Sequence, residues 1–290
     1  MPTKPRCVIT AFDGFDWDML VNMACFYRCC GFAVSVSSRL PAAAELLVLQ
    51  RGSWPSDAIF EGRFQQCHIY DYVGLPYVWP RSSVITTVSE YPFFPVIPAL
   101  WKGGGRPRSQ RRRLIHFGHV KPGLGGDPWQ SDLETLVAEG RCEAFGDGWP
   151  SGPVSLHRAI ELHRQADAAL SIQYPYQRGQ KVSSRMWQGP LSGCEVFSEA
   201  APDGVDLPGV RRVGSYREAL GAQRTPGIAK EAEAFWHEAT TRLADRLGLH
   251  YQPPSTLAAN TTYLKSVYWG HARAAARRLR IPKRLETATR

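Results

Sequence analysis

The chain has 290 residues, of which 43% are hydrophobic and 21% charged, so its length allows one large or two small hydrophobic cores and its composition excludes a disordered chain. No apolar run reaches the ~20 residues of a membrane-spanning helix, and the first apolar run is too short for a signal peptide because it meets Asp13. The seven cysteines show no Cys-x-x-Cys pair and no Cys/His ligand spacing, which argues against a disulfide framework and a structural zinc site. We therefore expect a reduced, cytoplasmic setting.

The net charge of +9 is distributed unevenly along the chain. Basic residues concentrate in two clusters: Arg106, Arg108, Arg111, Arg112 and Arg113 in the first, and Arg273, Arg277, Arg278, Arg280, Lys283 and Arg284 in the second. A basic protein favours anionic partners such as nucleotide phosphates, nucleic acid or an acidic membrane surface. The alternative is that the arginines merely reflect a GC-rich genome.

The first third of the chain alternates strand-like and helical segments. Apolar and β-branched residues predict strands at Cys7–Phe12, Phe32–Val36, Leu46–Leu49, Cys67–Val73 and Ser83–Val88. Residues 16–30 have apolar positions at helical spacing. This order predicts a mainly parallel sheet with helices outside it. The glycines at 103–105 and Pro107 break the pattern and mark a linker.

The alternation then restarts and is cleaner. Strands are predicted at Leu114–Val120, Cys142–Phe145, Ala168–Ile172, Cys194–Ser198 and Val210–Val213, and helices at Trp129–Glu139, Val154–Gln165, Ser183–Ser192 and Tyr216–Leu220. Two helices follow, Ile228–Leu247 and Ser255–Arg280, separated by Pro253 and Pro254. We expect three parts: an N-terminal lobe over 1–103, a second lobe over 104–250, and a C-terminal helix with a basic tail over 251–290.

Four segments of the second unit, in this order and spacing, resemble the donor-binding half of nucleotide-sugar glycosyltransferases of the GT-B type. They are LIHFGHV at 114–120, FGDGWP at 145–150, QADAALSI at 165–172, and KVSSRMWQGPLSGCEVFSE at 181–199, with SYREAL at 215–220 as the close of the motif. The resemblance implies an α/β fold of two Rossmann-like lobes with a cleft between them and a C-terminal helix that returns to the first lobe. It implies transfer of a hexose or pentose from a nucleoside-diphosphate sugar, UDP-linked, to a hydroxyl acceptor.

The donor diphosphate carries negative charge, which backbone N–H groups at glycine-rich turns and basic side chains can hold. Lys181 and Arg185 lie one helical turn apart and can face the same anion. The expected donor-binding residues are Gly118, Lys121, Gly146, Trp149, Tyr176, Gln180, Lys181, Ser183, Arg185 and Gln188. Trp149 and Tyr176 are candidates for stacking on the base, with core burial as the alternative. The family often has two glutamates eight positions apart, where this sequence has Gln180 and Gln188; a glutamine can hydrogen-bond a diol but carries no charge.

Two residues are candidates for proton transfer. His119 follows Gly118 at the end of a predicted strand, where an open α/β sheet places its ligands. Asp13 follows the first predicted strand and is our candidate for the acceptor-side base. The pattern Asp16-x-Asp18 could indicate a metal site, but acids also favour helix starts, so we expect no metal and no cofactor beyond the donor itself.

The acceptor is not encoded in a motif. A glycan or lipid-linked glycan, a small molecule and a hydroxylated base in DNA all remain open, and the last suits the arginines, since phosphate contacts supply affinity without sequence preference. Arg273, Arg277, Arg278 and Arg280 are the expected contacts to an anionic acceptor. The alternative functions are a non-catalytic or differently catalytic nucleotide-binding protein, such as a phosphotransferase or sugar-nucleotide epimerase on the same scaffold, and a nucleic-acid-binding protein without chemistry.

Overall fold

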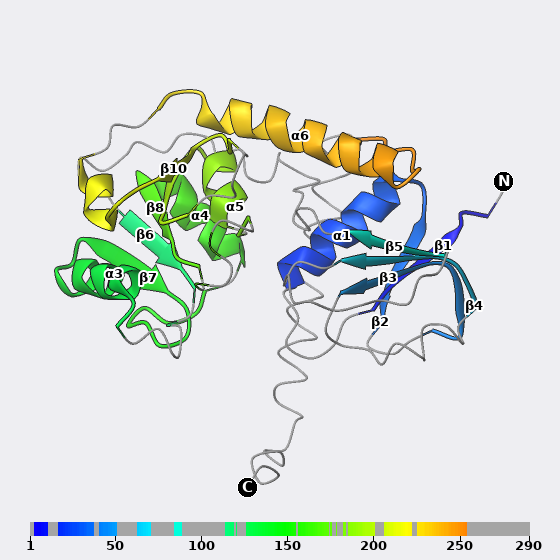
Figure 1. The fold of residues 1–290 in the computed structure, drawn as a ribbon, viewed down its shortest axis with the longest axis horizontal. Helices are drawn as coiled ribbons and strands as arrows, with labels where there is room; N and C mark the ends of the chain where they lie inside the picture. Colours follow the sequence, from blue (N-terminus) through cyan, green and yellow to red (C-terminus); the bar gives the residue numbers. More distant parts are fainter. Residues whose placement is uncertain are drawn as a thin grey trace, which may run out of the picture.

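The structure, a computed structural model, describes residues 3–10, 17–37, 41–50, 63–70, 84–88, 114–118, 120, 126–154, 156–173, 175, 178, 182–183, 185–200, 206–221 and 225–253. These residues form two α/β lobes that lie side by side, with one long helix across both (Figure 1). No helix among the described residues is long and apolar enough to span a membrane. All seven cysteines are described, and none is in a disulfide.

The first lobe is a five-stranded parallel sheet in the order β2-β1-β3-β4-β5. Its strands are β1 (Arg6–Thr10), β2 (Ala33–Ser37), β3 (Ala43–Gln50), β4 (Arg63–Tyr70) and β5 (Ile85–Val88). Helix α1 (Trp17–Cys29) packs on β1 and β2. The central strands are apolar on both faces, which is typical of parallel strands buried on two sides.

The second lobe repeats this order. Its parallel strands are arranged β7-β6-β8-β9-β10, so each lobe places its first strand second from one edge. The strands are β6 (Leu114–Phe117), β7 (Cys142–Phe145), β8 (Ala168–Ser171), β9 (Glu195–Ser198) and β10 (Val210–Arg212). Both lobes therefore have the doubly wound, Rossmann-like topology that the sequence predicted.

Helices cover the two faces of the second sheet. Leu114, Leu170 and Phe197 face α3 (Pro128–Ala138) and the 3-10 helix η3 (Tyr216–Leu220) in one buried cluster. Alternate residues of the same strands, Ile115 and Val196, face the side covered by α4 (Leu156–Gln165) and α5 (Arg185–Leu191). The period-2 alternation of a strand explains this division between faces.

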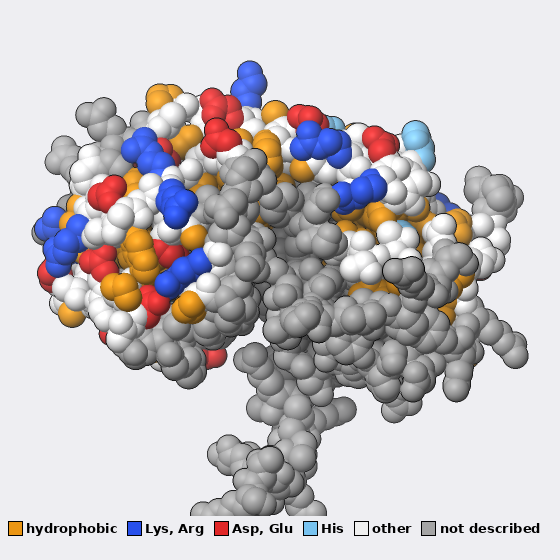
Figure 2. Space-filling view, in the orientation of Figure 1, with side chains coloured by type: hydrophobic (Ala, Val, Ile, Leu, Met, Phe, Trp, Pro, Cys, Tyr) orange, Lys and Arg blue, Asp and Glu red, His pale blue; other side chains and the backbone are white. Residues whose placement is uncertain are grey.

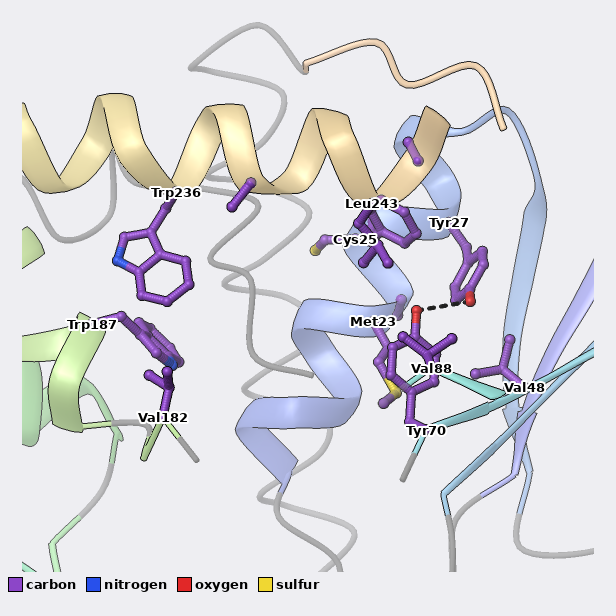
Figure 3. Close-up of a cluster of buried hydrophobic side chains, with 14 of the residues drawn as sticks. Met23, Cys25, Tyr27, Val48, Tyr70, Val88, Val182, Trp187, Trp236 and Leu243 are labelled. Carbon is purple, nitrogen blue, oxygen red and sulfur yellow. Dashed lines mark hydrogen bonds between the residues drawn. The ribbon is translucent and has the colours of Figure 1, made fainter. Parts of the chain in front are cut away.

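Helix α6 (Ile228–Arg246) connects the lobes. Its Trp236 lies against Trp187 of α5, while Leu243 reaches the side chains of α1, in one buried cluster with members in both lobes (Figure 3). After the helix, the Gln252 N–H donates to the Cys29 carbonyl at 3.0 Å, and the Tyr251 ring stacks on Phe26. One of the buried hydrophobic clusters therefore runs through both lobes by way of α6. The C-terminal helix expected over 255–280 lies outside the described residues.

Candidate functional site

The second sheet has a switch point at its first strand. β6 is flanked by β7 on one side and by β8 on the other. The chain therefore continues from β6 to β7 on one side and later crosses to β8 on the opposite side, so the strand order reverses at β6. Open α/β sheets bind ligands in the crevice outside the carboxyl ends of the strands at such a point. Phe117 and Ser171 end the two strands that define it here.

Arg185, the first residue of α5, lies directly at this switch point. Its Nε donates to the Phe117 carbonyl at the end of β6, and its Nη1 donates to the Ile172 carbonyl just beyond β8, at 3.4 Å. Two carbonyls, one at the end of β6 and one just beyond its neighbour β8, thus fix the guanidinium at the carboxyl edge of the sheet. The side chain is partly buried, which strengthens its electrostatic interaction with an anion relative to bulk water.

Gly118 makes room for this arginine. Its φ of 153° is unfavourable for residues with a side chain. A Cβ at this position would collide with Arg185 Nη2 and lie 3.1 Å from His116 Nε2. The glycine expected on sequence grounds is therefore required by both its backbone conformation and its neighbour.

His116 and Trp149 lie beneath the site. The His116 ring is fully buried and its Nδ1 is 2.9 Å from the Leu170 carbonyl, so Nδ1 carries the hydrogen. The Trp149 indole is only 7% exposed and meets His116 edge-on at 5.8 Å. Its Nε1 has no hydrogen-bond partner within the described chain. The burial of Trp149 matches the core alternative, and its role as a stacking surface stays a prediction.

A buried carboxylate lies at the carboxyl edge one strand further on. Glu199 directly follows β9, and its side chain has no solvent exposure. The Gln173 backbone N–H donates to Oε1 at 2.5 Å, and the Tyr216 and Ser198 hydroxyls donate to Oε2 at 3.0 and 3.2 Å. Arg178 also donates to Oε1 from its Nε, at 3.4 Å. The Tyr216 hydroxyl also donates to the Ser171 carbonyl at 2.6 Å and the Ser198 hydroxyl to the Ala200 carbonyl at 2.8 Å, so each of these hydroxyls shares its single hydrogen. The desolvation of the carboxylate is thus offset by two N–H donors, from Gln173 and Arg178, and by two shared hydroxyl hydrogens.

Arg178 links this carboxylate to a second acid. Its Nη2 donates to Asp127 Oδ2 at 2.7 Å, and Asp127 Oδ1 accepts the Trp129 and Gln130 backbone N–H groups that begin α3. The guanidinium therefore lies between two carboxylates from different parts of the lobe. Burial, followed by the nearby Glu199 charge, raises the pKa of Tyr216 well above its usual value, so Tyr216 remains a proton donor to this network.

The sequence-predicted residues fall into two sets. Six are described, all in the second lobe: Gly118, Gly146, Trp149, Ser183, Arg185 and Gln188. The other predicted positions, Asp13, His119, Lys121, Tyr176, Gln180, Lys181, Arg273, Arg277, Arg278 and Arg280, lie outside the described residues, and their roles stay predictions.

Three of the described positions add detail to the site. Gly146, which begins the turn after β7, donates its N–H to the Gly152 carbonyl at 2.9 Å. The Ser183 hydroxyl is 3.1 Å from that of Ser171 at the end of β8. Gln188 lies on α5 and is 6% exposed. The contact with Ser171 places Ser183 at the switch point, two residues before Arg185.

Glu199, Arg178 and Asp127 were not among the residues predicted from the sequence. The available signal was an acid placed directly after a buried strand, the position where α/β sheets hold functional side chains. Its partners could not be read from the sequence, because Arg178 lies 21 positions from Glu199 and 51 from Asp127. Within the described part of the chain, no group of three His, Cys, Asp or Glu side chains is arranged to hold a metal ion.

The chain is similar in structure to several solved proteins. The Anabaena protein HepE, solved in complex with UDP-glucose, superposes with a TM-score of 0.50 over 91% of this chain and 100% of its own, at 11% sequence identity. The DNA-modifying enzyme β-glucosyltransferase gives a TM-score of 0.49 over 93% and 98% of the two chains, at 13% identity. AviGT4, a glycosyltransferase involved in avilamycin A biosynthesis, gives 0.45 over 95% and 96%, at 14% identity. No protein-family model matches the sequence, and a search of curated proteins found no match.

The architecture is that of GT-B proteins: two Rossmann-like lobes, each a parallel sheet with the same strand order. The resemblance seen in residues 114–220 is confirmed at the level of the fold.

Proposed function

We propose that this chain is a glycosyltransferase that moves a sugar from a nucleoside-diphosphate sugar, UDP-linked, to a hydroxyl acceptor. The observation that carries the proposal is the position of Arg185. Its guanidinium is held at the switch point of the second lobe by hydrogen bonds to the Phe117 and Ile172 carbonyls. That crevice is where this topology binds nucleotides. The UDP-glucose bound by HepE, which shares the fold, supports the choice of donor.

The chemistry assigned to these residues follows from the charge that develops in transfer. The acceptor hydroxyl attacks the anomeric carbon, the bond from that carbon to the diphosphate oxygen breaks, and the diphosphate leaves with the bonding electrons. Arg185, together with the predicted Lys181, stabilises the negative charge on the leaving group. The predicted base Asp13 accepts the proton of the hydroxyl, and the predicted His119 contacts or protonates the diphosphate. No step in this scheme requires a divalent metal.

For the acceptor, we propose an anionic molecule, with a hydroxylated base in DNA as the most testable case. The net charge of +9 supports an anionic partner. On the face shown in Figure 2, Lys and Arg side chains are interspersed with Asp and Glu over the described part of the second lobe and α6. This mixed surface favours neither DNA nor a glycan, so the proposed contacts are the predicted arginines at 273, 277, 278 and 280.

The test is a panel of UDP, GDP, ADP and their glucose conjugates, measured by thermal shift and by release of nucleoside diphosphate. A ligand of the native state raises the melting temperature according to its concentration over Kd. We expect UDP and UDP-glucose to stabilise the protein, and Arg185→Ala to weaken UDP by about tenfold or more through loss of a charge-assisted contact. The absence of a shift with any nucleoside diphosphate at millimolar concentration would contradict the donor assignment.

Further arms of the same assay address the metal and the acceptor. Diphosphate release should persist in the presence of a chelator, and loss of release that manganese restores would contradict metal independence. Transfer to duplex or single-stranded DNA with hydroxylated bases should be weakened by neutralising the four C-terminal arginines, with a flatter salt dependence of binding. Transfer to glycans or small molecules alone would remove DNA from the proposal.

A further inference from the structure

Strands β6 and β8 stop pairing with each other just before the candidate site. Their last paired residues are His116 and Leu170, and each strand runs one residue further. Beyond that point, the Arg185 guanidinium donates to the Phe117 carbonyl at the end of β6 and to the Ile172 carbonyl just after β8. The arginine side chain therefore bridges the two strand ends where their backbone pairing has stopped.

The Ile172 carbonyl lies beyond the sheet, so groups outside the strand ladder must fix it. Pairing of β8 with β9 ends at Ser171, yet Ile172 and Gln173 are both buried, and buried backbone groups need partners. The Tyr216 hydroxyl donates to the Ser171 carbonyl at 2.6 Å, and the Gln173 N–H donates to Glu199 Oε1 at 2.5 Å. Ile172 is therefore held from both sides.

A single planar peptide connects Glu199 to Arg185. The Ile172 carbonyl and the Gln173 N–H belong to the same trans peptide, so they point in opposite directions. The carboxylate that accepts the N–H on one side thereby directs the carbonyl to the guanidinium on the other. Rotation of this peptide would break both contacts at once.

Tyr216 fixes both the preceding peptide and the carboxylate. Its side chain is fully buried, and its hydroxyl shares one hydrogen between the Ser171 carbonyl and Glu199 Oε2. The Tyr216 backbone N–H donates to Asp132 Oδ2 at 2.8 Å, which fixes the residue at the start of η3. Burial, followed by Glu199, raises the pKa of Tyr216, and the charge of Arg185 opposes this rise, so the guanidinium lies within electrostatic reach of the hydroxyl.

We propose that Tyr216 is a positioning residue for donor binding: together with Glu199, it fixes the peptide between Ile172 and Gln173, whose carbonyl holds Arg185 in the orientation that binds the donor diphosphate. This inference rests on the proposed function. Tyr216 does not touch the donor in this account, and its contribution to affinity passes through Arg185. A tyrosine that merely stabilised the lobe would contribute to UDP affinity whether or not Arg185 were present.

The experiment is a double-mutant cycle on the dissociation constant of UDP, measured by calorimetry for the wild type, Tyr216→Phe, Arg185→Ala and the double variant. Phenylalanine keeps the ring and removes only the hydroxyl. We expect Tyr216→Phe to weaken UDP by about fivefold, within the coupling range of residues in one hydrogen-bond network. In the Arg185→Ala background the same change should have no further effect. Losses that multiply in the double variant, or a Tyr216→Phe variant with wild-type affinity, would overturn the inference.

The matched control is Tyr27→Phe in the first lobe. Tyr27 is as buried as Tyr216, and its hydroxyl likewise has two hydrogen-bond partners, His68 and Tyr70. The change should lower the melting temperature and leave UDP affinity unchanged. An equal loss of affinity in Tyr27→Phe and Tyr216→Phe would show that the loss follows from destabilisation alone and would overturn the inference.

If Tyr216→Phe fails to fold, Glu199→Gln takes its place in the cycle. Glutamine has nearly the same shape but only one accepting oxygen for the donors that surround Glu199, so it weakens the hold on the same peptide. The same loss of affinity, absent in the Arg185→Ala background, is expected. A wild-type protein that binds no UDP would overturn the proposed function and this inference with it, whereas UDP binding that is weakened by Arg185→Ala but by neither of the other changes would overturn the inference alone.

Discussion

The two lobes have the same strand order but hold different kinds of buried polar group. In the first lobe, the Tyr27 hydroxyl is hydrogen-bonded to His68 Nδ1 at 2.8 Å and to the Tyr70 hydroxyl at 2.9 Å. In the second lobe, the corresponding network is ionic and joins Glu199 to Arg178. One scaffold thus carries a neutral network in one copy and a charged network in the other.

The pKa values follow this division. Burial lowers the pKa of His68 to about 4, and burial raises the pKa of Tyr27 well above its usual value, so both are uncharged at neutral pH. The neutral network fixes α1 against β4 and offers no charge to a ligand. Topology alone therefore does not make an anion site; the second lobe adds fixed charges at the carboxyl edge of its sheet.

The largest expected effect on stability is at the buried hydrophobic cluster that the two lobes share through α6. Trp236 of α6 is 1% exposed and belongs to the buried cluster that spans both lobes, so Trp236→Ala should lower the free energy of unfolding by about 3–5 kcal/mol. Urea denaturation followed by far-UV circular dichroism measures the loss. Glu238→Ala, on the exposed side of the same helix, is the control and should change the midpoint little. If Trp236→Ala left the midpoint unchanged, the lobes would not depend on a common core.

A second prediction addresses the neutral network. The pKa of His68 is about 4 in the folded protein, below its ordinary value of 6.5, so the unfolded chain binds a proton first as pH falls. Stability should therefore be lost between pH 6.5 and about 4, by up to about 3 kcal/mol from this residue. The pKa of His163 in the second lobe is lowered to about 4 as well, chiefly by burial, so His68→Gln should remove about half of the slope. Urea midpoints at several pH values measure the slope, and an unchanged slope in His68→Gln would show that folding does not shift the pKa of His68.

The third prediction separates the lobes by ligand affinity. Gly118→Ala introduces a side chain at a φ of 153° and against Arg185, which should cost about 1–3 kcal/mol of stability and weaken UDP binding. Gly31→Ala is the counterpart in the first lobe: its φ of 91° is also unfavourable, but among the described residues beyond its two chain neighbours no atom lies within 4 Å of the added Cβ. It should lower stability and leave UDP affinity unchanged. Equal losses of affinity in both variants, measured by calorimetry, would refute the assignment of the site to the second lobe.

The strands and helices were predictable from sequence because each has a strong local signal. The helix predicted over Ile228–Leu247 is observed at Ile228–Arg246, and the strand predicted over Cys194–Ser198 is observed at Glu195–Ser198. The bridging role of α6 was not predictable. Helical periodicity identifies an apolar stripe but does not say what covers it. The return to the first lobe that the sequence predicted for residues 255–280 lies outside the described residues.

The residues of the candidate site likewise divide into those that the sequence predicted and those that it did not. Arg185 and Gly118 were found because each belongs to a local motif, and the structure places them in contact at the switch point. Glu199 and Arg178 were not found, because the bond between them depends on the order of strands in space. Pairing of β8 with β9 brings Gln173 and Glu199 together from positions 26 apart in the chain.

The most direct test of the central claim, that the second lobe alone provides the donor site, is hydrogen exchange with and without saturating UDP, read by mass spectrometry. A bound ligand slows amide hydrogen exchange where it suppresses local opening of the backbone. We predict protection in peptides that cover residues 114–118, 171–178 and 195–200, and no change in those that cover 43–50 and 63–70 of the first lobe. Protection confined to the first lobe, or no protection in any peptide, would contradict the account.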